Sequence, residues 1–410
     1  GRELDLGWLG LAEFAPAALL VLVTGALADR HDRRRVVAVA VTAQAVASVA
    51  LALYAGSEPT AASPIFALVF AFGTARAFAA PAARALPADL VGPDRLPWVV
   101  ARYSGAWQAA LVAGPVAGGL LYAVDVRLPY VAAAALLLAS AASVLAVRPR
   151  AAGPAPAGVS PADALVEATV EPLMGGAGAV PPARAGLAEA IEGFRFIRRV
   201  PVLLGAISLD LFAVLFGGAV ALLPAIATDR LGVGAVGLGW LRAAGGLGAG
   251  AVALALAVRP LRRRIGPTLF AVVAAFGLGT IVLGLTRDYA VAFAAMVVLS
   301  GADAVSVFIR ATLVPLVTPD DKRGRVLAVE NVFIGGSHER GACESGGGGQ
   351  AFGPSAAIVL GGAATLAVAG TWWLLFPDLR RIDRFPAAAS SARPPEHDRT
   401  RPKGVSEANE

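Results

Sequence analysis

Charged residues are scarce in this chain, and so are cysteine and histidine. Only 16% of the 410 residues are charged, whereas soluble domains carry about 25%. Together with 57% hydrophobic residues and a mean hydropathy of +0.69, this composition excludes a soluble protein. The single cysteine, Cys343, excludes an internal disulfide.

Motifs typical of metal enzymes and ATP-driven pumps are missing as well. None of the three histidines (His31, His338 and His397) has a second histidine three or four positions on, which excludes a helical metal pair. No Gly-Lys-Ser/Thr phosphate loop occurs, which excludes an ATP-driven pump. We therefore expect no metal, no cofactor and no catalytic site. A polytopic membrane enzyme and a receptor that moves no cargo stay open as alternatives.

Long apolar runs predict an all-α, polytopic membrane protein. A helix needs about 20 residues to cross the hydrocarbon layer. Eleven segments have roughly this length: 7–28, 36–55, 62–80, 97–123, 128–147, 201–227, 233–257, 267–285, 289–316, 326–349 and 354–376.

The arginines predict how these segments are oriented. Loops rich in arginine alternate with loops that carry at most one, which supports the span count. By the positive-inside rule the arginine-rich loops and the C-terminus are cytoplasmic, and we place the chain in a bacterial inner (plasma) membrane. The formal net charge of +6 does not indicate nucleic-acid binding, because no aromatic residues are interleaved with the arginines to stack on bases.

Composition changes divide the chain into four regions. We expect an N-terminal bundle (1–147), a cytoplasmic linker (148–200), a C-terminal bundle (201–380) and a disordered cytoplasmic tail (381–410). The linker ends in an amphipathic segment whose apolar residues share one helix face: Leu187, Ile191, Phe194 and Ile197. We expect this helix to lie on the inner leaflet, with Arg195, Arg198 and Arg199 near lipid phosphates.

The loop after the first apolar segment carries the most specific motif. Residues 25–35 read Gly-Ala-Leu-Ala-Asp-Arg-His-Asp-Arg-Arg-Arg. This pattern resembles the loop after the second helix of major facilitator superfamily transporters. The basic segment 259–266 follows the corresponding helix of the second half, as a parallel internal repeat predicts.

Further motifs resemble branches of the same superfamily. Residues 114–119 read Gly-Pro-Val-Ala-Gly-Gly and resemble the G-P-x-x-G-G element of its proton antiporters. Several segments resemble the drug and siderophore exporters that include the enterobactin exporter: 76–82, 310–313, 318–320, 323–326 and 376–380.

The resemblance implies a major facilitator fold of two six-helix bundles and a proton-driven exporter of a drug-like compound or siderophore. The superfamily has twelve helices, and the chain opens at Gly1 with an external-looking start. We therefore expect the first helix to be missing from this sequence; a true eleven-helix protein is the alternative. The implied partners are a small-molecule substrate, protons and the lipid bilayer, with no nucleic acid and a monomeric protein.

Two sets of residues are implied to act in the conformational change. The family implies that Asp29 faces the N-terminus of a helix that here begins near Arg323, where a carboxylate gains charge-assisted bonds. The candidate latch residues are Gly25, Asp29, Arg30, Arg33, Arg34, Arg323 and Arg325. The antiporter-type residues Gly114, Pro115, Gly118 and Gly119 allow close helix approach and a bend. In each set the alternative is a purely topological or packing role.

Charged residues inside predicted spans are candidates for proton coupling or for the cargo cavity, because lipid exposure would be expensive. They are Glu13, Arg76, Asp210, Asp303, Arg310, Glu330, Glu339 and Glu344. Among the acids, Asp303 and Glu330 rank first because they should lie nearest mid-helix or the cavity. The glycines from Gly346 onward weaken the helix around Glu339 and Glu344. The alternative is ion pairs that only hold helices together.

Overall fold

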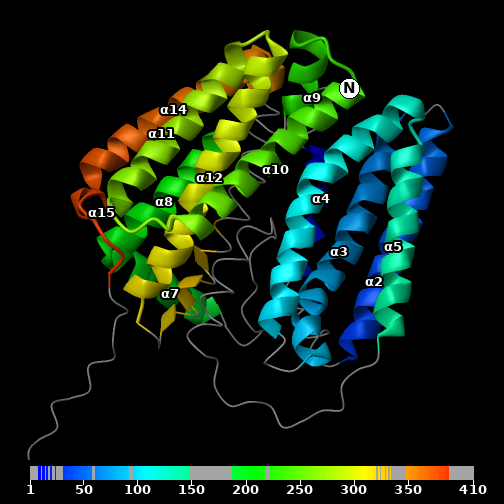
Figure 1. Ribbon diagram of the computed structural model, residues 1–410, viewed down its shortest axis with the longest axis horizontal. Coiled ribbons are helices and arrows are strands. Elements are labelled where there is room, and N and C mark those ends of the chain that lie inside the picture. Colours follow the sequence, from blue (N-terminus) through cyan, green and yellow to red (C-terminus); the bar gives the residue numbers. More distant parts are fainter. Residues whose placement is uncertain are drawn as a thin grey trace, which may run out of the picture.

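The computed structural model describes helices on both sides of the central linker (Figure 1). The described residues are 8–10, 12–13, 15–16, 19–20, 24, 31–57, 61–91, 96–147, 187–217, 222–319, 322–323, 325–327, 329–330, 333 and 348–386. Every regular element among them is helical. This confirms the all-α fold class.

The first bundle is built around α2 (Arg33–Ala55), which packs against α3 (Ser63–Leu90) and α5 (Leu128–Ala146). The helix α2 begins where the Asp32 carboxylate accepts a 2.9 Å hydrogen bond from the backbone N–H of Arg34. The core between these helices consists of small side chains: Val37, Ala38, Ala40, Val41, Ala79, Ala82 and Ala141. Small residues let apolar helices approach closely where lipid supplies no hydrophobic driving force.

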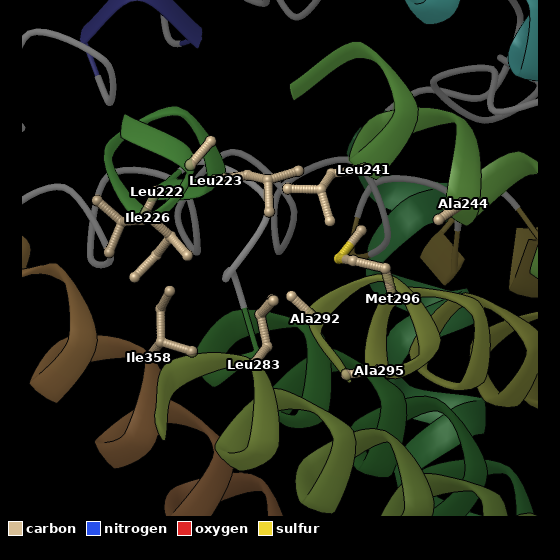
Figure 2. Packing of buried hydrophobic residues seen from close by; sticks show 11 residues of the cluster. Leu222, Leu223, Ile226, Leu241, Ala244, Leu283, Ala292, Ala295, Met296 and Ile358 are labelled. Carbon is tan, nitrogen blue, oxygen red and sulfur yellow. The ribbon is translucent and has the colours of Figure 1, made fainter. Parts of the chain in front are cut away.

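Five long helices of the second bundle lie among the described residues: α8 (Pro201–Phe216), α10 (Ala235–Val258), α11 (Ile265–Leu285), α12 (Tyr289–Val317) and α14 (Pro354–Leu375). Helix α11 packs against both α12 and α14. The short α9 (Leu223–Ala225) and the π-helical turn η2 (Ile226–Arg230) lie at one end, and α15 (Pro377–Arg380) lies at the other (Figure 1). Figure 2 shows Leu223 and Ile226 facing the ends of these helices, with Met296 beside Leu241.

Eight of the described helices are long and apolar enough to span a membrane, or nine if a bent pair counts as one span. The predicted count of eleven is therefore not confirmed. The predicted spans 7–28 and 326–349 lie largely outside the described residues. The predicted span 201–227 is described as α8 and then, beyond 218–221, as a 3₁₀ residue, α9 and the start of η2.

The bent pair joins the end of the linker to the second bundle. Helix α7 (Leu187–Arg199) meets α8 with a bend of 106° at Val200. This angle is compatible with a helix along a membrane surface leading into a span, and the interfacial position of α7 stays a prediction. The linker residues 148–186 and the tail from 387 onward lie outside the described residues.

The two bundles meet where α4 (Leu96–Val124) of the first lies against α10 of the second (Figure 1). These helices come from opposite ends of the linker, so this contact joins the two halves of the chain. Gly119 near the end of α4 lies against Ala235 at the start of α10, and both helix ends border loops predicted to be external.

Candidate functional site

A buried ion cluster lies in the second bundle. Arg310 on α12 places one guanidinium nitrogen 2.8 Å from the Asp210 carboxylate on α8 and another 3.5 Å from the Glu330 carboxylate. All three side chains are almost fully buried, with exposed fractions of 4%, 6% and 7%. The structure therefore brings together three residues that the sequence singled out separately.

The cluster is unbalanced in charge. It holds one guanidinium and two carboxyl groups, so it carries one net negative charge when both acids are ionised. The Nε atom of Arg310 has no hydrogen-bond partner among the described residues. Charge in an apolar interior is expensive unless it is paired and hydrogen-bonded. One bound proton makes this cluster electrically neutral.

Asp303 lies near the cluster on the same helix. It lines a cleft between α8, α11 and α12 together with Asp210 and Ser306. Asp303 also makes a polar or electrostatic interaction within the described part of the chain. Glu339 and Glu344 lie outside the described residues.

Arg76 of α3 forms an ion pair in the first bundle. Its guanidinium lies 2.6 Å from the carboxylate of Glu13, and the two side chains are 51% and 42% exposed. The sequence singled out both residues as charges inside predicted spans. The pair compensates both charges at a site that is much more open than the Arg310 cluster.

The antiporter-type residues of α4 lie at the seam between the bundles. A Cβ atom at Gly119 would lie 2.5 Å from the carbonyl oxygen of Ala235, and one at Gly239 would lie 2.5 Å from that of Pro115. Gly114 and Gly118 have no atom within 4 Å of such a Cβ. Within the motif, Pro115 and Gly119 thus form the close contact with α10.

A side-chain hydrogen bond also crosses this seam. The amide nitrogen of Gln108 on α4 donates to the carbonyl oxygen of Gly246 on α10 at 2.9 Å. Gln108 was not among the residues predicted from the sequence, although an amide inside an apolar run is a recognisable signal for helix–helix contact.

The latch residues are described only in part. Arg34 donates to the carbonyl oxygens of Val144 and Leu145 at the end of α5, which satisfies terminal carbonyls of that helix. Arg323 donates to the carbonyl oxygen of Pro315 at 3.2 Å. Arg33 makes a polar or electrostatic interaction as well. Gly25, Asp29 and Arg30 lie outside the described residues, so their contact with the second bundle stays a prediction.

Arg325 is held by the end of the linker. Its guanidinium lies 2.8 Å from the carboxylate of Glu192 on α7. Next to it, a Cβ atom at Gly193 would lie 2.7 Å from the carbonyl oxygen of Arg325. The role of Glu192 was not predictable from the sequence, because its partner lies far along the chain.

Three solved structures with a similar arrangement of helices are described as transporters. A bacterial homologue of the human lysosomal transporter Spinster, described as inward-facing and unoccupied, matches with a TM-score of 0.62 and 15% identity over 93% of this chain and 89% of that one. The human organic anion transporter TETRAN matches with a TM-score of 0.54 and 19% identity over 89% and 83%. A mutant of the nucleoside transporter NupG matches with a TM-score of 0.56 and 13% identity over 92% and 91%.

At such low sequence identity, the similarity to these structures shows a common fold and does not define the transported substrate. No curated protein sequence matches the chain significantly. A family model described as Major Facilitator Superfamily matches residues 2–337, which is most of the sequence. Transporters of this fold are secondary transporters that work by alternating access. The chain belongs to the major facilitator superfamily.

Proposed function

We propose that this protein is a proton-driven exporter of a small molecule, and that the cluster of Asp210, Arg310 and Glu330 binds the coupled proton. The observation that carries the proposal is the pairing of one buried guanidinium with two buried carboxyl groups. Such a cluster has two charge states that differ by one proton.

The coupling follows from the cost of buried charge. With a proton bound the cluster is neutral; without it one negative charge stays uncompensated in an apolar core. A transporter conformation that exposes the cluster to water tolerates the charged state, and one that seals it favours the neutral state. Proton binding therefore biases the equilibrium between the two conformations.

Export is the direction that the drug and siderophore exporter resemblance supports. Protons that move inward down their gradient release free energy, and alternating access couples this to outward movement of cargo. The cargo class proposed is a drug-like compound or a siderophore. The protein acts as a monomer in a bacterial inner membrane, with its C-terminus in the cytoplasm.

The test begins with a substrate screen in a host that lacks its own exporters. The best substrate is then loaded into vesicles that hold the purified protein, and efflux is measured with and without an imposed pH gradient. Glu330→Gln and Asp210→Asn should abolish the response to the gradient while leaving exchange of cargo for cargo intact.

The matched control is Asp229→Asn, which removes a carboxylate from the turn η2 outside the cluster. It should transport like the wild type. The proposal fails if the wild type ignores the gradient, or if both cluster variants respond to it normally.

A further inference from the structure

The cleft between α8, α11 and α12 adds a step to the proton's path. We infer that a water molecule bound to Ser306 in this cleft passes the coupled proton between Asp303 and Asp210, with Ser306 as its positioning residue. This inference rests on the proposed proton coupling, and its own test is separable from that of the function.

The first observation is the composition of the cleft. Two carboxyl groups and one hydroxyl line it, and the remaining lining residues are apolar: Ala213, Val214, Val272, Val273, Phe276 and Ala302. The cleft has room for about one water molecule. The polar groups that meet in it come from α8 and α12, while α11 contributes only apolar side chains.

The second observation is the hydroxyl of Ser306. This side chain is 3% exposed, and its Oγ has no hydrogen-bond partner among the described residues. Four other buried hydroxyls, in helices or directly after one, donate to the carbonyl oxygen one turn earlier: Ser48, Thr280, Thr318 and Thr365. A buried hydroxyl without a partner is uncommon and marks a bound water or a functional group. Its position in the cleft lining indicates a water placed between the two acids.

The third observation is the alignment of the polar residues along α12. Asp303, Ser306 and Arg310 are three and four positions apart, so they share one face of the helix. From Asp303 to Arg310 the helix rises by about 10 Å. Asp210 connects the cleft with the ion cluster, since it lines the cleft and also pairs with Arg310 at 2.8 Å.

These residues outline the proposed route. Asp303 lies near the middle of α12, and the Arg310 cluster lies closer to the end predicted to be cytoplasmic. The charged groups along the route are Asp303 and Arg310 from α12, Asp210 from α8, and Glu330 from the segment that follows α12.

The transfer step conserves atoms and charge. The O–H bond of protonated Asp303 breaks as its proton binds the water, while one of the water's own protons forms a new O–H bond on the Asp210 carboxylate. The water is regenerated, Asp303 becomes a carboxylate, and no electrons are transferred. Ser306 keeps the water between the two acids throughout.

The first test needs no cargo. Infrared difference spectra of the purified protein in lipid are recorded between acid and alkaline buffer, in ordinary and in ¹⁸O-labelled water. The wild type should show an isotope-sensitive O–H band of a bound water, and Ser306→Ala should lose it. Ser306→Thr, which keeps a hydroxyl, should retain the water band.

The matched control is Thr312→Val on the same helix. The hydroxyl of Thr312 donates to the carbonyl oxygen of Phe308, so its removal should leave the water band unchanged. The inference is overturned if the wild type lacks the band, or if Ser306→Ala retains it.

Transport gives the second measurement. With a substrate from the screen, Ser306→Ala and Asp303→Asn should slow gradient-driven efflux by roughly tenfold or more, while cargo exchange without a gradient stays at the wild-type rate. If a sodium gradient drives efflux by the wild type at equal pH on both sides, the coupled ion is sodium and the proton relay is overturned. Failure of the proposed function has a different signature, because the wild type itself would then ignore the pH gradient.

Discussion

At the scale of single residues, burial separates two ion pairs that look alike in the sequence. Arg310 and Arg76 both lie inside predicted spans, and each has an acidic partner within 3 Å. The pair of Arg76 with Glu13 is about half exposed, so its contribution to stability is modest. The Arg310 cluster is almost fully buried, so loss of the guanidinium leaves two acids without compensation.

The first prediction follows from this contrast. Arg310→Met should lower the free energy of unfolding by about 3–5 kcal/mol, the usual cost of breaking a buried ion pair. Arg76→Met should lower it by about 1 kcal/mol or less, as for an exposed pair. Denaturant unfolding in detergent micelles measures both. Adding Asp210→Asn and Glu330→Gln to Arg310→Met should recover part of the loss, and equal effects of the two arginine variants would contradict the assignment.

The same residues show what the sequence could and could not predict. Local composition is sufficient to place Asp210, Arg310 and Glu330 inside spans, because a charge within an apolar run is visible in the sequence. Their mutual contact depends on how α8, α12 and the segment after α12 pack. Asp210 and Arg310 are 100 positions apart, and no periodicity connects them. Ser306 was missed because a lone serine in a helix gives no signal until its unpaired hydroxyl is seen.

At the scale of helices, the close contact between α4 and α10 requires glycine at positions 119 and 239, because a Cβ atom there would clash with the facing backbone. The sequence predicted that the motif glycines allow close helix approach, and for Gly119 the structure shows that approach. Gly114 and Gly118 face open space. The spacing of the glycines in the sequence does not tell which of them contact the facing helix.

The second prediction uses two neighbouring glycines of the motif. Gly119→Ala should force α4 away from Ala235, since its Cβ would lie 2.5 Å from that carbonyl oxygen. An overpacked contact of this kind costs about 1–3 kcal/mol, and transport should fall with it. Gly118→Ala is the matched control, because a Cβ there meets no atom within 4 Å. Thermal unfolding and efflux measure both, and equal behaviour of the two variants would refute the seam.

The docking of α7 is a helix contact that the sequence did not predict. Gly193 lies against the backbone of Arg325, and Ile197 is buried with Val314 and Val326. The ring of Phe194 meets that of Phe333 at 6.1 Å. The end of the linker is thereby fixed to the segment that carries Glu330.

The third prediction separates packing from charge in this contact. Gly193→Ala should detach α7, because its Cβ would lie 2.7 Å from the carbonyl oxygen of Arg325. Glu192→Gln should have little effect, since the pair with Arg325 is partly exposed and worth about 1 kcal/mol or less. Limited proteolysis at the arginines of α7 reports detachment. If Glu192→Gln releases α7 and Gly193→Ala does not, the charge holds the helix and the packing argument is wrong.

At the scale of the whole molecule, the fold was predictable because its determinants are local. Runs of apolar residues predict the helices and their order, and the basic loop at 25–35 resembles that of the superfamily whose model matches residues 2–337. The predicted count of eleven spans is not confirmed, because the predicted spans 7–28 and 326–349 lie largely outside the described residues and α8 as described covers only Pro201–Phe216. The cargo is not encoded in any such local pattern.

The last prediction concerns the latch between the two halves. Asp29→Asn should strongly reduce transport without unfolding the protein, because it removes the charge expected to meet the helix that begins near Arg323. Arg325, which follows Arg323 closely in the sequence, pairs with the Glu192 carboxylate at a partly exposed site, so an exchange of carboxylate partners during transport is open to it. Asp32→Asn is the matched control in the same loop: Asp32 caps α2 through its side-chain oxygen, and asparagine caps a helix equally well. Efflux and thermal unfolding of both variants decide the matter, and normal efflux by well-folded Asp29→Asn protein would show that the loop serves topology alone.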